Sequence, residues 1–269
     1  MNYKQLFGNT KPVMAMVHLK GDSPEDIQQR ARQEIGIYFD CGVDAVLVEN
    51  YFGSAGDVDR TLDYLHRHMP DAIYGVNVLG DHRRAYEYAA RYDAKFIQID
   101  SVCGHLKPNQ DGIYAAELEA LRRDSRAALL GGVRFKYQPV RSGRSVAEDV
   151  LLGKERCDAI VVTGEGTGMA TPIDKVKEFR SIAGDFPLII GAGVTLSSLR
   201  KDIPHCDGFI VGSWFKENHS AEGEVCEAYV REFMAERNRL LAEMDLKQKG
   251  ICDFTGEYAF FGNESHCAH

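Results

Sequence analysis

The chain has 269 residues, of which 44% are hydrophobic, and a formal net charge of −8 at pH 7. This length and apolar content suit one large α/β domain or two small ones, and the acidic charge argues against a nucleic-acid-binding protein. No apolar run approaches the roughly 18 residues of a membrane-spanning helix, and the first residues lack the apolar core of a signal peptide. We therefore expect a cytoplasmic protein with no spanning segment.

Eight short apolar runs recur along the chain, and amphipathic stretches separate them. Most of the runs are nearly continuous in Val, Ile, Leu and Ala, which is typical of parallel strands that are covered on both faces. We predict strands, in chain order, at Val13–His18, Ala45–Glu49, Ile73–Leu79, Phe96–Asp100, Leu129–Lys136, Ala159–Thr163, Leu188–Gly191 and Phe209–Gly212.

Local signals between these runs predict helices. Ser23 followed by Pro24 supplies an N-cap and a proline at the first helical position. Ser145 and Glu148 have the spacing of a capping box. A long amphipathic segment over Ala221–Leu246 closes the series.

Eight alternating strand and helix units without a linker predict a closed (β/α)8 barrel, the TIM-barrel fold of the α/β class. We assign residues 1–248 to this single domain, and residues 249–269 to a C-terminal tail that packs on the barrel or contacts another subunit. An open doubly wound sheet is the alternative, but it usually carries a glycine-rich phosphate loop after its first strand. Here the first strand ends in Val17-His18-Leu19.

In barrels of this kind, the active site lies where the strands end. The predicted strand ends carry an unusually polar set of residues for such apolar strands. The catalytic candidates are Asp100, Lys136, Glu49 and His18, and the substrate-binding candidates are Asn50, Asn77, Thr163, Glu165, Gly191, Gly193, Gly212 and Ser213.

The catalytic candidates each have a functional and a structural interpretation. Glu49 and Asp100 can act as a general base or as metal ligands, or they can form structural ion pairs. Lys136 can bind an anion, stabilise an enolate or form a Schiff base, and its structural alternative is an ion pair with Asp100 or Glu165. His18 is either an acid–base group or a hydrogen-bonded structural residue.

Two glycine-ended strands near the end of the series predict a phosphate site. Gly191-Ala192-Gly193 and Gly212-Ser213 let the backbone approach an anion closely, and Thr195 begins a short helix after the first of them. Asn50 and Asn77 would orient a hydroxylated substrate, although asparagine is also an ordinary turn residue.

Five motifs at the predicted strand ends together resemble the BtpA/SgcQ family over roughly residues 10 to 240: Met16–Leu19, Val46–Asn50, Val161–Glu165, Gly191–Thr195 and Asp207–Ser213. The resemblance implies a TIM barrel. It implies no particular reaction, since within the family BtpA is linked with photosystem I accumulation in cyanobacteria and SgcQ with a sugar-utilisation gene cluster. The family's proline-rich stretch after the first strand is reduced here to Lys20–Pro24, which points to a different substrate.

We expect an enzyme that acts on a phosphorylated sugar or nucleotide-like metabolite by isomerisation, aldol-type cleavage or cleavage of a glycosidic bond. The phosphate would bind between Gly191–Thr195 and Gly212–Ser213. One alternative is a non-catalytic assembly or stability factor, and another is a metal-dependent hydrolase that uses His18, Glu49 and Asp100. We expect no cofactor, with a divalent metal left open, and a homo-oligomer.

Overall fold

The computed structural model describes residues 2–249, and within them eight parallel strands close into a barrel in the order β1 to β8. Each strand pairs with its neighbours in sequence, and β8 pairs back with β1. This topology confirms the predicted (β/α)8 fold. The strands are β1 (Val13–Val17), β2 (Ala45–Glu49), β3 (Tyr74–Asn77), β4 (Phe96–Cys103), β5 (Ala128–Val133), β6 (Ala159–Val162), β7 (Leu188–Ile190) and β8 (Gly208–Val211).

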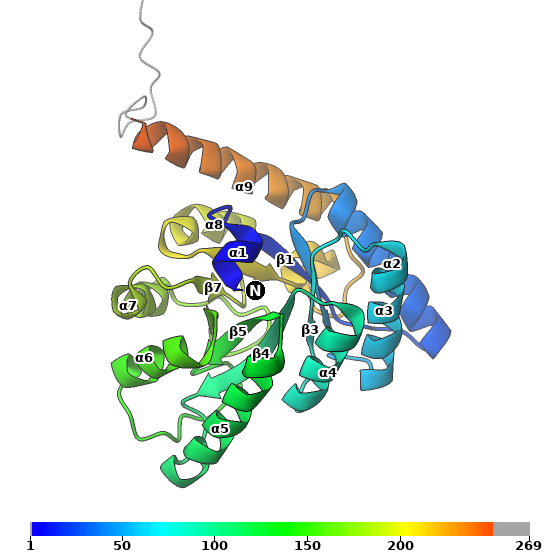
Figure 1. The fold of residues 1–269 in the computed structure, drawn as a ribbon. Coiled ribbons are helices and arrows are strands. Elements are labelled where there is room, and N and C mark those ends of the chain that lie inside the picture. Colours follow the sequence, from blue (N-terminus) through cyan, green and yellow to red (C-terminus); the bar gives the residue numbers. More distant parts are fainter. Residues whose placement is uncertain (1, 250–269) are drawn as a thin grey trace, which may run out of the picture.

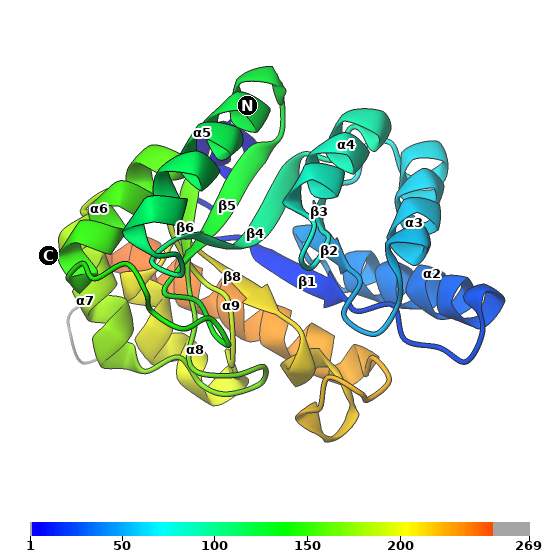
Figure 2. The ribbon, with the colours of Figure 1, turned by 90° about the horizontal axis from the view of Figure 1, so that it is seen from below.

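A helix follows each strand and covers the outside of the barrel (Figures 1 and 2). The last helix, α9 (Glu227–Gln248), packs against both α8 (Leu196–Asp202) and α2 (Pro24–Asp40) and so completes the ring of helices. Ser23 caps the first of them, as predicted, and Ser145 forms the predicted capping box with Glu148. The helices are α2 (Pro24–Asp40), α3 (Ala55–His68), α4 (His82–Tyr92), α5 (Pro108–Asp124), α6 (Val146–Arg156), α7 (Ile173–Ala183), α8 (Leu196–Asp202) and α9 (Glu227–Gln248).

Alternate side chains of each strand fill the barrel interior and the space between the strands and the helices. In β1, Met14 and Met16 belong to the apolar cluster inside the barrel, whereas Val13, Ala15 and Val17 belong to the cluster between the strands and the helices. Successive side chains of a strand point to opposite faces. Because both faces are buried, the strands are continuous apolar runs in the sequence.

A short N-terminal helix, α1 (Tyr3–Phe7), closes the amino-terminal end of the barrel, and the sequence patterns did not predict it. Tyr3 and Phe7 are buried in the same cluster as the interior strand residues, and the Phe7 ring lies 6.0 Å from the ring of Phe96. Figure 1 looks onto this end, with α1 over the middle of the barrel. The carboxyl end of the strands is therefore the end that remains for a ligand.

The fifth strand is shorter than predicted. β5 ends at Val133, so Lys136 lies in the following loop and not at the strand end. The next residue, Arg134, has a left-handed backbone with a φ of 49°, which takes the chain out of the sheet. Its Nε donates to Asp149 Oδ2 at 2.8 Å, and the buried ion pair fixes this bend.

The last helix begins later than predicted. α9 starts at Glu227 and not at Ala221, because the chain before it forms two 3-10 turns, η2 (Ser213–Phe215) and η3 (Glu217–His219). Asn218 inside the second turn has a φ of 55°, which interrupts any longer helix. The segment after β8 is therefore a structured loop at the mouth of the barrel.

The predicted tail, residues 249–269, lies outside the described residues except for Lys249. Its predicted role in packing or in subunit contact remains a prediction. Within the part of the chain that the structure describes, no helix combines the length and the apolar content that crossing a membrane requires.

We predict that Gly132→Ala destabilises the barrel. A Cβ at this position of β5 would lie 1.8 Å from the backbone oxygen of Asp100 and 2.5 Å from the ring of Phe135. Because the strands must shift to relieve this overlap, the free energy of unfolding measured in urea should fall by about 1–3 kcal/mol.

Gly36→Ala in α2 is the matched control, because a Cβ there meets nothing within 4 Å. Alanine is favoured over glycine inside a helix by about 1 kcal/mol, so this variant should be as stable as the wild type or more stable. Equal unfolding free energies for the two variants would contradict the described packing of β5.

Candidate active site

The polar residues at the mouth of the barrel continue the inward-facing positions of the strands. His18 directly follows β1 and comes two residues after the interior Met16, and in β2, Glu49 comes two residues after the interior Leu47. Asp100 holds the equivalent inward position in β4. Because side chains two residues apart lie on one face of a strand, these groups lie directly above the apolar interior.

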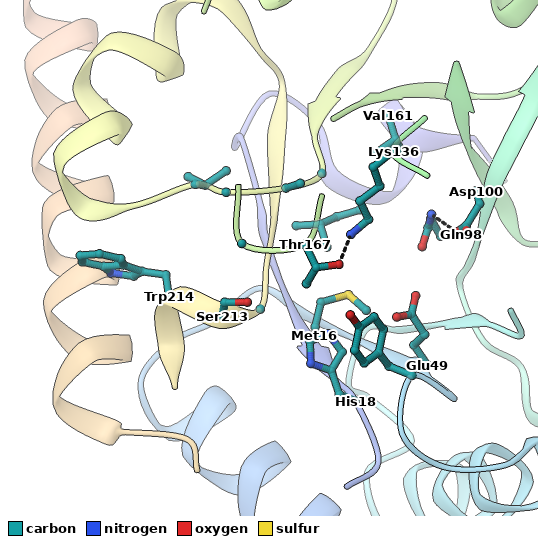
Figure 3. A pocket seen from close by; sticks show the side chains of 18 of the residues that line it. Met16, His18, Glu49, Gln98, Asp100, Lys136, Val161, Thr167, Ser213 and Trp214 are labelled. Atoms are coloured by element: carbon teal, nitrogen blue, oxygen red, sulfur yellow. Dashed lines mark hydrogen bonds between the residues drawn. The ribbon is translucent and has the colours of Figure 1, made fainter. Parts of the chain in front are cut away.

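These side chains line a cavity of about 150 Å³ at the carboxyl ends of the strands (Figure 3). A single water needs about 10–15 Å³ on the same measure, so the cavity has room for a small metabolite. Its acid–base side contains Glu49, Gln98, Asp100 and Lys136. Its loop side is formed by the loops after β7 and β8 and contains Gly191, Ala192, Gly193, Val194, Thr195, Gly212, Ser213 and Trp214.

One amide group links the acidic residues of the acid–base side. Asn77 Nδ2 lies 2.7 Å from Glu49 Oε2, 2.8 Å from Gln98 Oε1 and 3.1 Å from Asp100 Oδ1. Gln98 Nε2 also donates to Asp100 Oδ1 at 3.2 Å. Asn77 is thus buried behind the two carboxyl groups and positions them.

The two carboxyl groups differ from ordinary surface acids in their protonation. Burial raises the pKa of Glu49 to about 7, the negative charge of Asp100 adds to the rise, and Lys136 and the Asn77 amide oppose it. Burial also raises the pKa of Asp100, and its hydrogen bond from Asn77 and the charge of Lys136 oppose that rise. Glu49 can therefore bind and release a proton near neutral pH, as general acid–base catalysis requires.

Lys136 reaches the cavity from the loop after β5. Its Nζ donates to Thr167 Oγ1 at 3.1 Å, and its backbone N–H donates to Thr163 Oγ1 at 2.8 Å. The hydrogen bond from Nζ to Thr167 takes the place of the ion pair with Asp100 or Glu165 that the sequence left open as a structural alternative. The ammonium group is therefore available to a negatively charged or carbonyl oxygen of a ligand.

A second lysine fixes the loop that carries Lys136. Lys175 of α7 donates from Nζ to the carbonyl oxygens of Arg134 at 3.2 Å and Thr163 at 2.7 Å. Burial lowers the pKa of Lys175. These contacts join the ends of β5 and β6 and so position Lys136 indirectly.

His18 lies between the two sides of the cavity, beside Gly212. Its side chain is buried, and its ring centroid lies 4.9 Å from that of Tyr51. Burial lowers the pKa of His18 well below its usual value, and the ammonium groups of Lys216 and Lys136 lower it further. The imidazole is therefore neutral at pH 7.

The loop side offers unpaired backbone donors. The N–H groups of Gly193, Val194, Ser213 and Trp214 have no backbone acceptor among residues 2–249. Gly193 has a φ of 63°, and a Cβ there would lie 2.0 Å from the backbone oxygen of Met169, so only glycine fits. Unpaired backbone N–H groups on loops that line a cavity are suited to an anion.

The short helix after β7 begins with a capping box. Thr195 Oγ1 accepts a hydrogen bond from the Ser198 N–H at 3.0 Å, and Ser198 Oγ accepts one from the Thr195 N–H at 3.1 Å. This capping box satisfies the N–H groups of Thr195 and Ser198, so these two donors are not available to an anion.

Four of the predicted binding residues do not line the cavity, and one of them, Asn77, contacts the two carboxyl groups from behind. Asn50 lies one residue beyond Glu49 and so faces away, and its Oδ1 accepts from the Leu79 N–H at 2.7 Å. Thr163 is fully buried behind the loop after β5, and Glu165 is exposed. Whether these residues contact a ligand stays a prediction. In the structure, Asn50 and Thr163 position neighbouring loops through their hydrogen bonds.

The sequence analysis missed several residues that line the cavity. Gln98 follows the inward alternation of β4 and precedes Asp100 by two residues, so strict counting along the strand would have found it. Tyr51, Trp214 and His219 lie on loops. Loop residues carry no periodic signal, so nothing in their spacing indicated a place in the site.

The acidic residues do not form a recognisable metal centre. Within the described residues, no group of three His, Cys, Asp or Glu side chains is placed to hold a metal ion. The Asn77 amide lies between Glu49 and Asp100, and His18 Nδ1 faces the ammonium group of Lys216. This donor geometry gives no support to the metal-dependent hydrolase hypothesis.

The fold and the cavity define a (β/α)8-barrel protein with a ligand site at the carboxyl ends of its strands. Residues 9–239 match the BtpA family, and the chain belongs to that family, which confirms the resemblance seen in its motifs. An uncharacterised protein of Thermococcus kodakarensis is 33% identical over 274 residues, which cover 90% of this chain and 98% of the relative. The Photosystem I biogenesis protein BtpA of Synechocystis is 28% identical over 81% of this chain and 85% of the relative.

Solved structures support the fold. Thiamine phosphate pyrophosphorylase from Pyrococcus furiosus superposes with a TM-score of 0.58 at 14% identity, over 87% of this chain and 98% of that protein. At this identity the likeness concerns the barrel alone.

We predict that Glu49→Gln removes a pH dependence of stability. The folded state raises the pKa of Glu49 from 4.5 to about 7, so folding favours the protonated form. Its favourable contribution is complete below the unfolded pKa and is lost as the pH rises through 7. From about pH 5 to about pH 8, the unfolding free energy of the wild type should therefore fall by about 2–3 kcal/mol relative to that of the variant.

Urea denaturation at both pH values measures this difference. Glu165→Gln is the matched control, because it removes an exposed carboxylate from a neighbouring loop. Its unfolding free energy should change between the two pH values as that of the wild type does. If the unfolding free energy of Glu49→Gln also changes as that of the wild type does, Glu49 does not titrate near neutral pH.

Proposed function

We propose that the protein is an enzyme that acts on a small phosphorylated metabolite of the sugar-phosphate or nucleotide-like class through general acid–base chemistry. One observation carries the proposal: a single cavity joins unpaired backbone donors on its loop side to a titratable carboxyl pair and a lysine on its acid–base side. The first group suits a phosphate, and the second suits proton transfer at the other end of the same molecule.

The arrangement supports a division of roles. The phosphate would bind between Gly193 and Ser213, which places the rest of the ligand toward the carboxyl groups. Glu49 would move a proton, because its pKa of about 7 permits both protonation states. Lys136 would stabilise a developing oxyanion, or would attack a carbonyl carbon to form an imine with loss of water.

Isomerisation or aldol-type cleavage fits this division best, since both reactions pass through an enolate next to a carbonyl group. Cleavage of a glycosidic bond would instead use Glu49 and Asp100 as an acid and a carboxylate partner. We further propose that the enzyme works in the cytoplasm as a homo-oligomer, which is common for barrels of this size.

The second candidate function is a non-catalytic role in the assembly or stability of another protein. The similarity to the Photosystem I biogenesis protein BtpA favours it, as do the exposed apolar side chains of Tyr137, Val140 and Met169 on loops near the mouth of the barrel. It requires neither Asp100 nor Lys136. A double Asp100→Asn/Lys136→Met variant that keeps its biological role would support it over the enzymatic one.

We predict that Ser213→Asp weakens the binding of inorganic phosphate about tenfold or more, because a carboxylate on the loop side repels the anion. Isothermal titration calorimetry measures this change. Ser220→Asp adds the same charge at an exposed position of the same loop and should bind phosphate like the wild type. Equal affinities for Ser213→Asp and the wild type would place phosphate elsewhere.

We predict that Glu49→Gln and Asp100→Asn each lower kcat about 100- to 10,000-fold with a phosphorylated substrate found by screening. Phosphate affinity should stay close to that of the wild type, because these residues lie on the acid–base side. A variant pair that retains full turnover would remove the carboxyl groups from the reaction.

The role of Lys136 has a separate chemical test. If an imine forms, borohydride added during turnover reduces it to a stable amine, and mass spectrometry finds the substrate's carbon skeleton attached to Lys136. Inactivation without such an adduct would contradict that site of attachment. Continued turnover in borohydride with a verified substrate would leave Lys136 only its charge-stabilising role.

A further inference from the structure

A buried lysine lies behind the histidine of the cavity. Lys216, in the loop between β8 and α9, is only 1% exposed. Its Nζ lies 3.5 Å from His18 Nδ1 and 3.4 Å from the carbonyl oxygen of Ala221. Burying an ammonium group costs free energy unless other groups compensate its charge, so this position requires partners for Lys216.

A carboxylate from the first barrel helix supplies part of that compensation. Glu34 Oε1 of α2 lies 3.8 Å from Lys216 Nζ. Burial lowers the pKa of Lys216, whereas Glu34 and Glu224 raise it. The pair therefore keeps an ammonium group directed at the back of the His18 ring.

The donor and acceptor chemistry of this contact fixes the histidine tautomer. A lysine ammonium has hydrogens to donate and no lone pair to accept, so His18 Nδ1 must accept in this contact. A neutral imidazole carries one proton, which must then lie on Nε2. The opposite tautomer would direct an Nδ1–H at the Lys216 ammonium group, which also donates to the Ala221 carbonyl at 3.4 Å.

The other nitrogen of the ring faces the loop side of the cavity. A Cβ built on Gly212 would lie 3.1 Å from His18 Cε1 and 3.4 Å from His18 Nε2. Gly212 and Ser213 both line the cavity, as His18 does, and Figure 3 shows His18 and Ser213 among the lining side chains. An Nε2–H would therefore lie on the edge of the ring that faces Gly212.

We propose that Lys216, held by Glu34, is a positioning residue that fixes His18 as a neutral donor whose Nε2–H binds an anionic oxygen of the ligand. His18 is then a ligand-binding group, and the transfer of protons falls to Glu49 and Asp100. The identity of the ligand as a phosphorylated molecule rests on the proposed function. The tautomer does not, because it is a property of the protein without ligand.

The charged groups that face His18 favour its neutral form. Lys216 faces it from the loop after β8 and Lys136 from the loop after β5, and both are ammonium groups that lower its pKa. From the loop after β2 it meets the rings of Tyr51 and Phe52, which are uncharged. The Ala221 carbonyl is the one group that raises the pKa of His18, and Lys216 donates to that oxygen.

Nuclear magnetic resonance of the full chain labelled with 15N-histidine tests the tautomer directly. Long-range 1H–15N correlations identify which ring nitrogen carries the proton, and the loss of signals in His18→Gln assigns His18 among the nine histidines. We expect the Nε2–H tautomer at pH 7 in the absence of any ligand. A proton on Nδ1, or a charged ring, would overturn the proposal without reference to any variant.

The double variant Lys216→Met/Glu34→Gln tests the role of the pair, since it removes both buried charges and leaves neither unpaired. We expect the pKa of His18 to rise, its signals to report a mixture of tautomers and its affinity for inorganic phosphate to fall severalfold. Lys20→Met is the matched control, because Lys20 binds the same loop through the Glu222 carbonyl at an exposed position. An unchanged tautomer and pKa in a folded double variant would overturn the role of Lys216.

Phosphate binding separates this inference from the proposed function. Addition of inorganic phosphate to the wild type should shift the Nε2 signal of His18. A wild type that shows the Nε2–H tautomer but binds no phosphate by calorimetry would refute the phosphate site of the proposed function, and the tautomer measurements would still support the role of Lys216. Phosphate that binds without moving the Nε2 signal would overturn the donor role of His18.

Discussion

The arrangement of this site depends on one constraint: two carboxyl groups, the buried Glu49 and the half-buried Asp100, share one amide partner at the mouth of a barrel whose interior is apolar. A buried carboxylate costs several kcal/mol unless partners compensate it. Here the Asn77 amide contacts both groups and the charge of Lys136 opposes the rise in the pKa of each. This compensation is incomplete, so the pKa of Glu49 stays near 7, which is the property that makes it suitable for proton transfer.

Charge is distributed unevenly around the cavity, and the distribution gives the two sides different chemistry. The acid–base side contains ionisable groups whose states are coupled, whereas the loop side offers neutral backbone donors and a neutral imidazole. Burial lowers the pKa of that imidazole, and the ammonium group of Lys216, which Glu34 partly compensates, lowers it further without placing a second charge in the cavity itself. A ligand with a phosphate at one end and a carbonyl or hydroxyl group at the other would match both sides at once.

Much of this could be predicted from the sequence, because strand alternation carries the information. The spacing that places Met16 inside the barrel also places His18 at its mouth, and the same rule leads to Glu49 and Asp100. The rule also explains the failures. Asn50 is one residue out of step and faces away, and Lys136 reaches the cavity only because Arg134 turns the chain out of β5, a bend that depends on a tertiary ion pair. Lys216 had no signal, since its position follows from the turns of a loop.

The central claim is that the phosphate of a ligand binds at the loop side while its reacting group lies at the acid–base side. A crystal structure of the protein soaked with inorganic phosphate tests this claim most directly. The account predicts phosphate density within hydrogen-bonding distance of the Gly193 and Ser213 N–H groups and of His18 Nε2. Phosphate bound instead at Lys136 on the acid–base side, or an empty cavity at saturating phosphate, would contradict it.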